Sequence, residues 1–467
     1  MLYKTHDCGK LDKTNVGQTV VLNGWLQRRR DLGGVLFIDL RDRSGLVQTV
    51  FNPDFSGDAL LAGEKARNEY VLAVKGKVVG RDPSTFNANM KTGEIEVQVT
   101  EIEILNPAKN PPFFIEDGQD TDETVRLKYR YLDLRRPEMQ KSLMLRSKAA
   151  KLFRDYLDEH DFIEVETPIL TKSTPEGARD YLVPSRVHPG EFYALPQSPQ
   201  IFKQLLMVGG LERYYQIARC FRDEDLRSDR QPEFTQVDIE TSFISQEHLH
   251  EMMEELMVRL LKETIGVSIE RPFQRLSYAD AIGKYGSDKP DLRFGLELVD
   301  LSDLVASSGV KVFASVIENG GQVKALNAKG CGTWSRKEID DLLPFASRFG
   351  AKGLAWITYK EGEMKGPIVK FFTEQELEDV KTRMGIEEGD LILFSADKKK
   401  IVADVLGNLR LKIGRDLGLI NEAEFKFAWV VDFPLLGYDE EAKRYVAEHH
   451  PFTRPKEEDI AYFHTDP

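Results

Sequence analysis

The stretch FRDEDLRSDRQPEFTQVDIE, from Phe221 to Glu240, holds seven carboxylates and three arginines in twenty residues, with strand-like alternation on either side of a proline. Alternate residues share one face of a strand, so Arg222 extends the face of Gln216 before the loop. Asp238 and Glu240 share a face after it. Two antiparallel strands joined by DEDLRSDRQP would therefore place Arg222 beside a row of polar groups. Buried unpaired charges are costly, so such a row needs ligands or partners. Taken alone, the motif also fits a solvent-facing sheet with salt bridges.

Length and composition indicate a soluble globular protein. A chain of 467 residues is long enough for about three domains. It is 41% hydrophobic and 30% charged, with a net charge of −13, which favours solubility and names no partner. Cys8, Cys220 and Cys331 stand far apart, which argues against a zinc site or a disulfide framework. The sequence shows no signal-peptide core and no membrane span, so we expect a cytoplasmic protein.

Residues 19 to 105 read as an all-β module of about five short strands separated by turn residues. The apolar residues of the last strand change phase, from Ile95, Val97 and Val99 to Ile102 and Ile104. A β-bulge near Thr100 would reconcile the two phases. The pattern matches a small oligonucleotide-binding barrel, and a small β-sandwich remains the alternative.

The same module carries residue types that suit single-stranded RNA. They are Arg28, Arg29 and Arg30 after the first strand, Phe37, Asp39 and Arg41 on one face of the second, and Gln48 on the third. A basic run beside an exposed aromatic ring and an amide can track phosphate, stack a base and read a base edge. The alternative is a solvated charged rim with Phe37 in the core.

Beyond a linker rich in proline and acidic residues, the chain predicts a long amphipathic helix. Its apolar residues at helical spacing are Leu145, Ala149, Leu152, Phe153 and Tyr156. A strand ending at Pro168 should follow. Residues ~290 to 425 read as an α+β insert without a catalytic constellation, and its role stays open.

Three short motifs could contribute to a site. In QSPQIFKQLLM we expect Ser198 as N-cap and Pro199 at the first helical position, which puts Gln200 and Lys203 on one helix face, suited to a small carboxylate. STPEGARD, with Glu176 and Arg179, could form a lid or an ordinary turn. The adjacent histidines of HHPFT, His449 and His450, are more often surface residues than ligands.

Together these pieces resemble the class II aminoacyl-tRNA synthetases, and closely those of the bacterial aspartyl type. The long helix and FIEVETPIL resemble the first class motif, which forms a homodimer interface, and FRDED…RQPEFTQVDIE resembles the second, which lies over ATP. The implied fold is α+β multidomain, with an oligonucleotide-binding barrel, an antiparallel-sheet catalytic domain and an α+β insert. The implied parts are residues 1–107 (anticodon barrel), 108–135 (hinge), 136–288 (catalytic, first part), 289–425 (insert) and 426–467 (catalytic continuation).

The resemblance implies an aspartate–tRNA ligase that uses ATP and Mg²⁺, with L-aspartate and the aspartate tRNA as substrates and neither membrane nor DNA as partner. Arg222 matches the arginine that acts on the α-phosphate. The ATP contacts implied are Arg222, Asp223, Glu224 and Gln231. The aspartate contacts implied are Glu176, Ser198, Gln200, Lys203, Arg222, Asp238, His449 and His450, with Lys203 on the substrate's side-chain carboxylate.

For tRNA, the resemblance implies anticodon contacts from Arg30, Phe37 and Gln48. Leu32 resembles the residue found in versions that charge only the aspartate tRNA and discriminate against the asparagine tRNA. Two alternatives stay open. One is a non-catalytic relative that binds RNA or amino acid, and the other is a ligase for asparagine or lysine, which the positive charge of Lys203 opposes.

The family continues beyond the equivalent of Pro467 with a third motif that holds an adenine-stacking arginine, a metal ligand and a second substrate arginine. The resemblance therefore implies that this chain lacks a C-terminal part, holds no metal ligand in these residues and makes no aspartyl-adenylate by itself.

Overall fold

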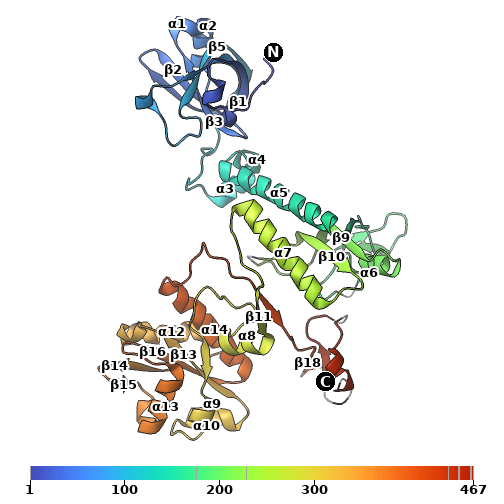
Figure 1. The fold of residues 1–467 in the computed structure, drawn as a ribbon, viewed down its shortest axis with the longest axis vertical. Helices are drawn as coiled ribbons and strands as arrows, with labels where there is room; N and C mark the ends of the chain where they lie inside the picture. The colour runs from blue at the N-terminus through green and yellow to red at the C-terminus, as the bar shows by residue number, and fades with distance from the viewer. Residues whose placement is uncertain are drawn as a thin grey trace. The chain divides into compact units, whose positions relative to one another are not determined.

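The computed structural model describes residues 2–174, 176–227, 229–439, 441–450, 453–462 and 465. The chain divides into two compact units, Met1–Asp155 and Tyr156–Pro467. Figure 1 shows the elements of each unit. The five-part division predicted from the sequence is finer and stays a prediction.

The first unit begins with a closed five-stranded barrel in the order β1-β2-β3-β5-β4 (Figure 1). Its elements are β1 (Thr19–Leu32), β2 (Val35–Asp42), β3 (Gly45–Phe51), α1 (Pro53–Ser56), α2 (Asp58–Lys65), β4 (Val71–Gly80) and β5 (Ile95–Asn106). A barrel confirms the predicted module and excludes the sandwich. The register of β4 against β5 shifts where Gly76 pairs with Val99 and Lys75 with Glu101, which confirms the bulge at Thr100.

The rest of this unit holds α3 (Glu123–Lys128), α4 (Arg130–Asp133) and most of α5 (Pro137–Glu159), which contains the predicted long helix. A buried ion-pair network connects the hinge to the barrel. Glu69 accepts two hydrogen bonds from Arg41 at 2.8 Å and one from Arg135 at 2.8 Å. The Arg135 guanidinium also lies 5.0 Å from the centre of the Trp25 ring.

The second unit contains a small mixed sheet in the order β10-β9-β6. Its first elements are β6 (Ile163–Glu164), β7 (Leu182–Pro184), β8 (Phe192–Ala194), α6 (Gln200–Val208), β9 (Arg213–Phe221), β10 (Glu233–Thr241) and α7 (Gln246–Ile265). Strands β9 and β10 are antiparallel, as predicted, and β6 runs parallel to β9. Helix α6 packs against both β9 and β10, which places its inward side chains over the paired strands.

The insert has its own sheet of five strands, ordered β12-β13-β16-β14-β15. Its elements are β12 (Leu298–Asp300), α9 (Ser302–Val305), α10 (Lys311–Glu318), β13 (Gln322–Ala328), α11 (Arg336–Asp340), α12 (Leu342–Ser347), β14 (Ala355–Lys360), β15 (Glu363–Lys365), α13 (Glu374–Met384), β16 (Leu391–Asp397) and α14 (Lys399–Asp416). Leu391 and Leu393 face one apolar core, and Ile392 and Phe394 face the other. The insert is therefore α+β, as predicted.

A parallel pair of strands joins the segment just before the insert to the segment just after it. Strand β11 (Gln274–Ser277), just before α8 (Tyr278–Tyr285), pairs with β17 (Ala428–Val431). The hairpin β18 (Leu436–Asp439) and β19 (Arg444–Ala447) comes next in the chain. Trp429 on β17 stacks on His250 of α7 at 4.2 Å and donates to Glu254 at 2.9 Å, which anchors β17 to α7. In the described part of the chain, no helix is both long and apolar enough to cross a bilayer.

Candidate active site

The paired strands β9 and β10 present one polar face. Their register places Asp238 opposite Gln216 and Glu240 opposite Tyr214. Directly opposed residues in an antiparallel pair point to the same side of the sheet, so these four side chains share a face. The charge of the loop region therefore belongs to a structured strand-loop-strand unit, as the alternation predicted.

Lys203 reaches this face from α6. Its ammonium lies 2.7 Å from Asp238 Oδ1 and 3.5 Å from Glu240 Oε2. The Lys203 and Asp238 side chains are only 12% and 8% exposed, so water screens their attraction weakly. Asp238 Oδ2 is buried and accepts no hydrogen bond from any described residue. The face thus holds a buried ion pair with one oxygen left without a donor.

The predicted cap of α6 is wrong by one residue. The helix begins at Gln200, Pro199 takes the N-cap position, and no side chain caps it. The Ser198 hydroxyl instead donates to Glu176 Oε2 at 2.6 Å. A partner far away in the sequence therefore outcompetes the local backbone for this hydroxyl. Gln200 is half-buried at the helix start, three residues before Lys203.

The segment that carries Glu176 and Arg179 is tied to the site. Glu176 also accepts from the Thr174 hydroxyl at 2.9 Å. The buried Gln197 amide donates to the Ala178 carbonyl at 2.8 Å and to Asp180 at 2.5 Å. The backbone of Arg179 forms a β-bridge with Asp223. The structure thus brings Glu176 to Ser198, and it joins this segment to the loop after β9.

Arg222 follows β9 and stacks on an aromatic ring. Its guanidinium carbon lies 5.0 Å from the centre of the Phe234 ring, and its buried Nε donates to no described residue. Glu224 pairs with Arg230 at 3.1 Å, whereas Gln231 is exposed. A cation held by packing rather than by a carboxylate keeps its donors available for a phosphate.

No thiol of this face is poised as a nucleophile. Burial is the main reason that the pKa of Cys220 rises to about 11, and the negative charge of Asp238 adds to it. The thiolate is the reactive form of cysteine, so this side chain is inert near neutral pH. All three cysteines are buried and free.

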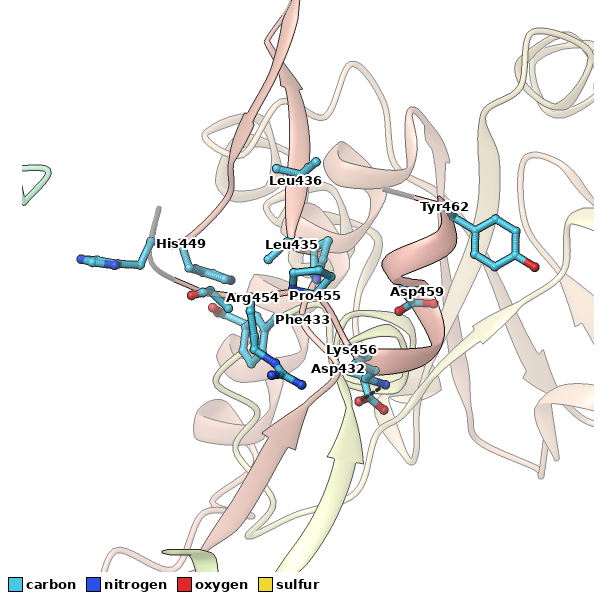
Figure 2. Close-up of a pocket in the computed structure, with 14 residues that line it drawn as sticks. Asp432, Phe433, Leu435, Leu436, His449, Arg454, Pro455, Lys456, Asp459 and Tyr462 are labelled. Atoms are coloured by element: carbon cyan, nitrogen blue, oxygen red, sulfur yellow. Dashed lines mark ion pairs between the residues drawn. The ribbon is translucent and has the colours of Figure 1, made fainter. Parts of the chain in front are cut away.

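His449 and His450 line a separate cavity of about 1020 Å³, seen in Figure 2. The His449 ring meets the Phe433 ring edge-on at 4.7 Å, and Lys456 pairs with Asp432 at 2.6 Å. The described residues that line this cavity include none of the predicted aspartate contacts from residues 176 to 238. The structure therefore does not bring the two histidines together with Lys203.

The barrel presents the predicted RNA residues as one connected group. Arg30 donates to Asp39 at 2.7 Å and to Gln48 at 3.2 Å, and its guanidinium lies 6.0 Å from the Phe37 ring centre. Gln48 is 5% exposed and donates to Glu96 at 2.9 Å. Phe37 is half-buried and is not part of the barrel core, so the packing of that core does not depend on its ring. Leu32, at the end of β1, is 66% exposed.

The described residues do not assemble a metal centre. No group of three or more His, Cys, Asp or Glu side chains among them has a metal-binding arrangement. Mg²⁺ in phosphate chemistry often uses only one or two carboxylates together with phosphate oxygens, so the search for larger groups does not test the expected Mg²⁺.

Sequence reasoning missed two residues of the face. Tyr214 is fully buried and donates to Gln216 Oε1 at 2.9 Å. The Thr167 hydroxyl donates to the same oxygen at 2.9 Å. Extending the alternation of Gln216 back by two residues would have placed Tyr214 on the face. Thr167 gives no such signal, because it comes from a different segment.

Comparison with known proteins identifies the class of this fold and site. A family model described as class II tRNA synthetases (D, K and N) matches residues 122–466, and one described as an OB-fold nucleic acid binding domain matches residues 20–105. The chain belongs to the class II tRNA synthetases. A solved asparaginyl-tRNA synthetase from Pyrococcus horikoshii shares the fold, with a TM-score of 0.53, 17% identity and coverage of 88% of this chain and 96% of that one.

Closer relatives carry more specific names. The chain is 62% identical to the aspartate–tRNA ligase of Halalkalibacterium halodurans, over 100% of this chain and 79% of that protein. It is 61% identical to the protein from Geobacillus sp. named aspartate–tRNA(Asp/Asn) ligase, with the same coverage. These matches do not support the predicted loss of a C-terminal part, and the inactivity inferred from that loss is unconfirmed.

The buried ion pair gives a stability prediction. We expect Lys203→Met to lower the free energy of unfolding by about 3 to 5 kcal/mol, because it leaves a buried carboxylate without its cation. Adding Asp238→Leu should recover most of this loss, because both charges are then gone. Hydrogen exchange in denaturant, followed on peptides from α6 and β9, measures the change.

Arg219→Met is the matched control, because its pair with Glu233 at 3.0 Å is half-exposed. It should cost at most about 1 kcal/mol. A Lys203→Met variant as stable as this control would contradict the buried-pair assignment.

Proposed function

We propose that this chain is an aspartate–tRNA ligase. It activates L-aspartate with ATP and transfers the aspartyl group to the 3′ end of the aspartate tRNA. The observation that most supports this activity is the buried Lys203 beside Asp238 on the polar face, with Arg222 at the end of the same strand pair. The names of relatives at 61% and 62% identity support the same activity.

Each predicted role follows from the chemistry of activation. The α-carboxylate of aspartate attacks the α-phosphorus of ATP, the bond to the β-phosphate oxygen breaks, and pyrophosphate leaves. Negative charge builds on the α-phosphate oxygens, and Arg222 with its unengaged Nε is the donor we assign to them. Glu224 and Gln231 are assigned to the adenine end of ATP, and Asp223 to the same loop.

Lys203 is assigned to the substrate's side-chain carboxylate. An ammonium has three donors, and Asp238 occupies one at short distance, so donors remain for a carboxylate. An asparagine amide or a lysine ammonium would leave that cation poorly paired. Ser198 is assigned to the neighbourhood of the substrate ammonium, Gln200 to the aspartate pocket, and Glu176 to closure over the substrate. His449 and His450, which line a separate cavity, are assigned to closure from the resemblance to the family alone.

The wider assignments rest on the resemblance to the family. ATP and Mg²⁺ are the proposed cofactors, and the cytoplasm is the proposed compartment.

We also propose a homodimer through the first class motif, where Leu143, Met144 and Leu145 of α5 are 41% to 53% exposed. Exposed apolar residues in a contiguous run are typical of an interface, and a sedimentation mass equal to one chain would contradict it.

Arg222→Ala tests the catalytic assignment. Removing a preorganised donor to a transition state typically costs ~10² to 10³ in rate, so aspartate-dependent pyrophosphate exchange by the full-length protein should fall by that factor. Arg219→Ala is the control, because Arg219 lies on the opposite face of β9 and is exposed. Activity of the Arg222 variant within about threefold of the parent would contradict the assignment.

Gln48→Ala tests the barrel as the anticodon reader. Loss of one base contact should cost ~1 to 3 kcal/mol, so charging of the aspartate tRNA should weaken more than charging of a tRNA with a substituted anticodon. Gln18→Ala removes an exposed amide from the same barrel and should change neither. Equal charging of both tRNAs by the Gln48 variant and the parent would refute the anticodon role.

We propose that the enzyme discriminates against the asparagine tRNA, from Leu32 at the end of β1. Relatives of similar identity carry both the aspartate and the Asp/Asn names, so the comparisons leave this choice open. Charging of aspartate and asparagine tRNA transcripts, measured side by side, should favour the former by at least about tenfold, equivalent to one base contact. Comparable charging of both would overturn the proposal.

A further inference from the structure

Tyr214 is buried on the polar face of β9 and β10, and none of the assignments above gives it a role. It lies on β9 opposite Glu240, and Gln216, two residues on, lies opposite Asp238. The whole residue is 0% exposed. A tyrosine hydroxyl usually has a partner when buried, and here it lies among the polar groups that surround Lys203.

The hydroxyl has one proton and two neighbouring acceptors. It donates to Gln216 Oε1 at 2.9 Å, although the Thr167 hydroxyl already donates to that oxygen at 2.9 Å. Asp238 Oδ2 is buried and receives no donor from the described residues. Leaving the buried Asp238 oxygen without a donor costs more free energy than Gln216 gains from a second hydrogen bond. Donation to Asp238 is therefore a favourable alternative for the Tyr214 proton.

Electrostatics support the proximity of the phenol and the carboxylate. Burial, followed by the negative charge of Asp238 and by side-chain hydrogen bonding with that carboxylate, raises the pKa of Tyr214, so the hydroxyl stays protonated and can act only through its single donor near neutral pH. Lys203 meanwhile serves Asp238 and Glu240 in this structure. A substrate carboxylate that binds the remaining donors of Lys203 shares its positive charge with Asp238, so Asp238 then gains more from another donor.

We propose that Tyr214 is a positioning residue for aspartate recognition: its hydroxyl turns from Gln216 to Asp238 when Lys203 turns to the substrate's side-chain carboxylate. Thr167 keeps Gln216 satisfied while the proton is away. No covalent bond forms or breaks in this step. The inference rests on the proposed function, because it concerns the aspartate side chain of that reaction.

Tyr214→Phe removes the hydroxyl and keeps the ring. Hydrogen bonds to charged groups are the stronger kind, so the KM for aspartate in pyrophosphate exchange by the full-length protein should rise about tenfold or more. The contact is made equally in the ground and transition states, so kcat should stay within about threefold, and the KM for ATP should not change. Equilibrium binding of aspartate, measured by calorimetry, should weaken by the same factor as KM rises.

Tyr215→Phe is the matched control. Tyr215 is adjacent, 1% exposed and on the opposite face, where its hydroxyl donates to Asp158 at 2.9 Å. This variant loses an equally buried hydroxyl and should keep the parent's KM for aspartate. Equal changes in the two variants, or an ATP KM that moves together with the aspartate KM, would show a merely structural role and overturn the proposal.

Thr167→Val provides a second test away from Asp238. Without the threonine hydroxyl, Gln216 retains the Tyr214 proton, so the KM for aspartate should rise in the same direction as for Tyr214→Phe. An unchanged KM in either variant overturns the inference. Absence of aspartate-dependent exchange in the parent protein would instead refute the proposed function, so the two failures are distinguishable.

Discussion

The register between β9 and β10 is the constraint on which the whole site depends. Side chains alternate across a sheet, so a slip of one residue would turn Asp238 and Glu240 to the opposite face and leave Lys203 without a partner. The nine opposed pairs from Glu233–Phe221 to Thr241–Arg213 fix that register. Most of the charge after β9 therefore lies in the loop from Arg222 to Pro232, which connects two strands of fixed register.

Buried charge in this protein serves orientation more than stability. Removing an ion pair such as Lys203–Asp238 from water costs about as much as the attraction returns, so a hydrophobic replacement would fold comparably well. The barrel contains a similar group of buried ions, in which Arg41 and Arg135 each donate to the Glu69 carboxylate at 2.8 Å. In both places the ions fix directions that apolar packing would leave free.

Features set by local periodicity could be predicted from the sequence, whereas contacts between distant segments could not. Period-two alternation predicted the barrel strands, the bulge at Thr100 and the shared face of Asp238 and Glu240. Local preference predicts the Ser198 hydroxyl as a helix cap, but in the structure this hydroxyl donates to Glu176, twenty-two residues away. The contact of Thr167 with Gln216 depends in the same way on the fold. Positions of the two histidines relative to Lys203 likewise had no local signal.

The balance of charges around Lys203 indicates that the substrate is selected by the geometry of the site and not by its net charge. Glu176, Asp238 and Glu240 are carboxylates, whereas Lys203 and Arg222 are the cations, so net charge does not attract a second carboxylate to this face. Aspartate is favoured only if a donor points at its side chain in a place that water cannot screen. Lys203, to which we assign this role, is shielded from water because helix α6 and the sheet leave its side chain only 12% exposed. Selectivity for a carboxylate then depends on how firmly the neighbouring acids are held by donors other than Lys203. The role proposed for Tyr214 is of this kind, because its hydroxyl would hold Asp238 while Lys203 binds the substrate.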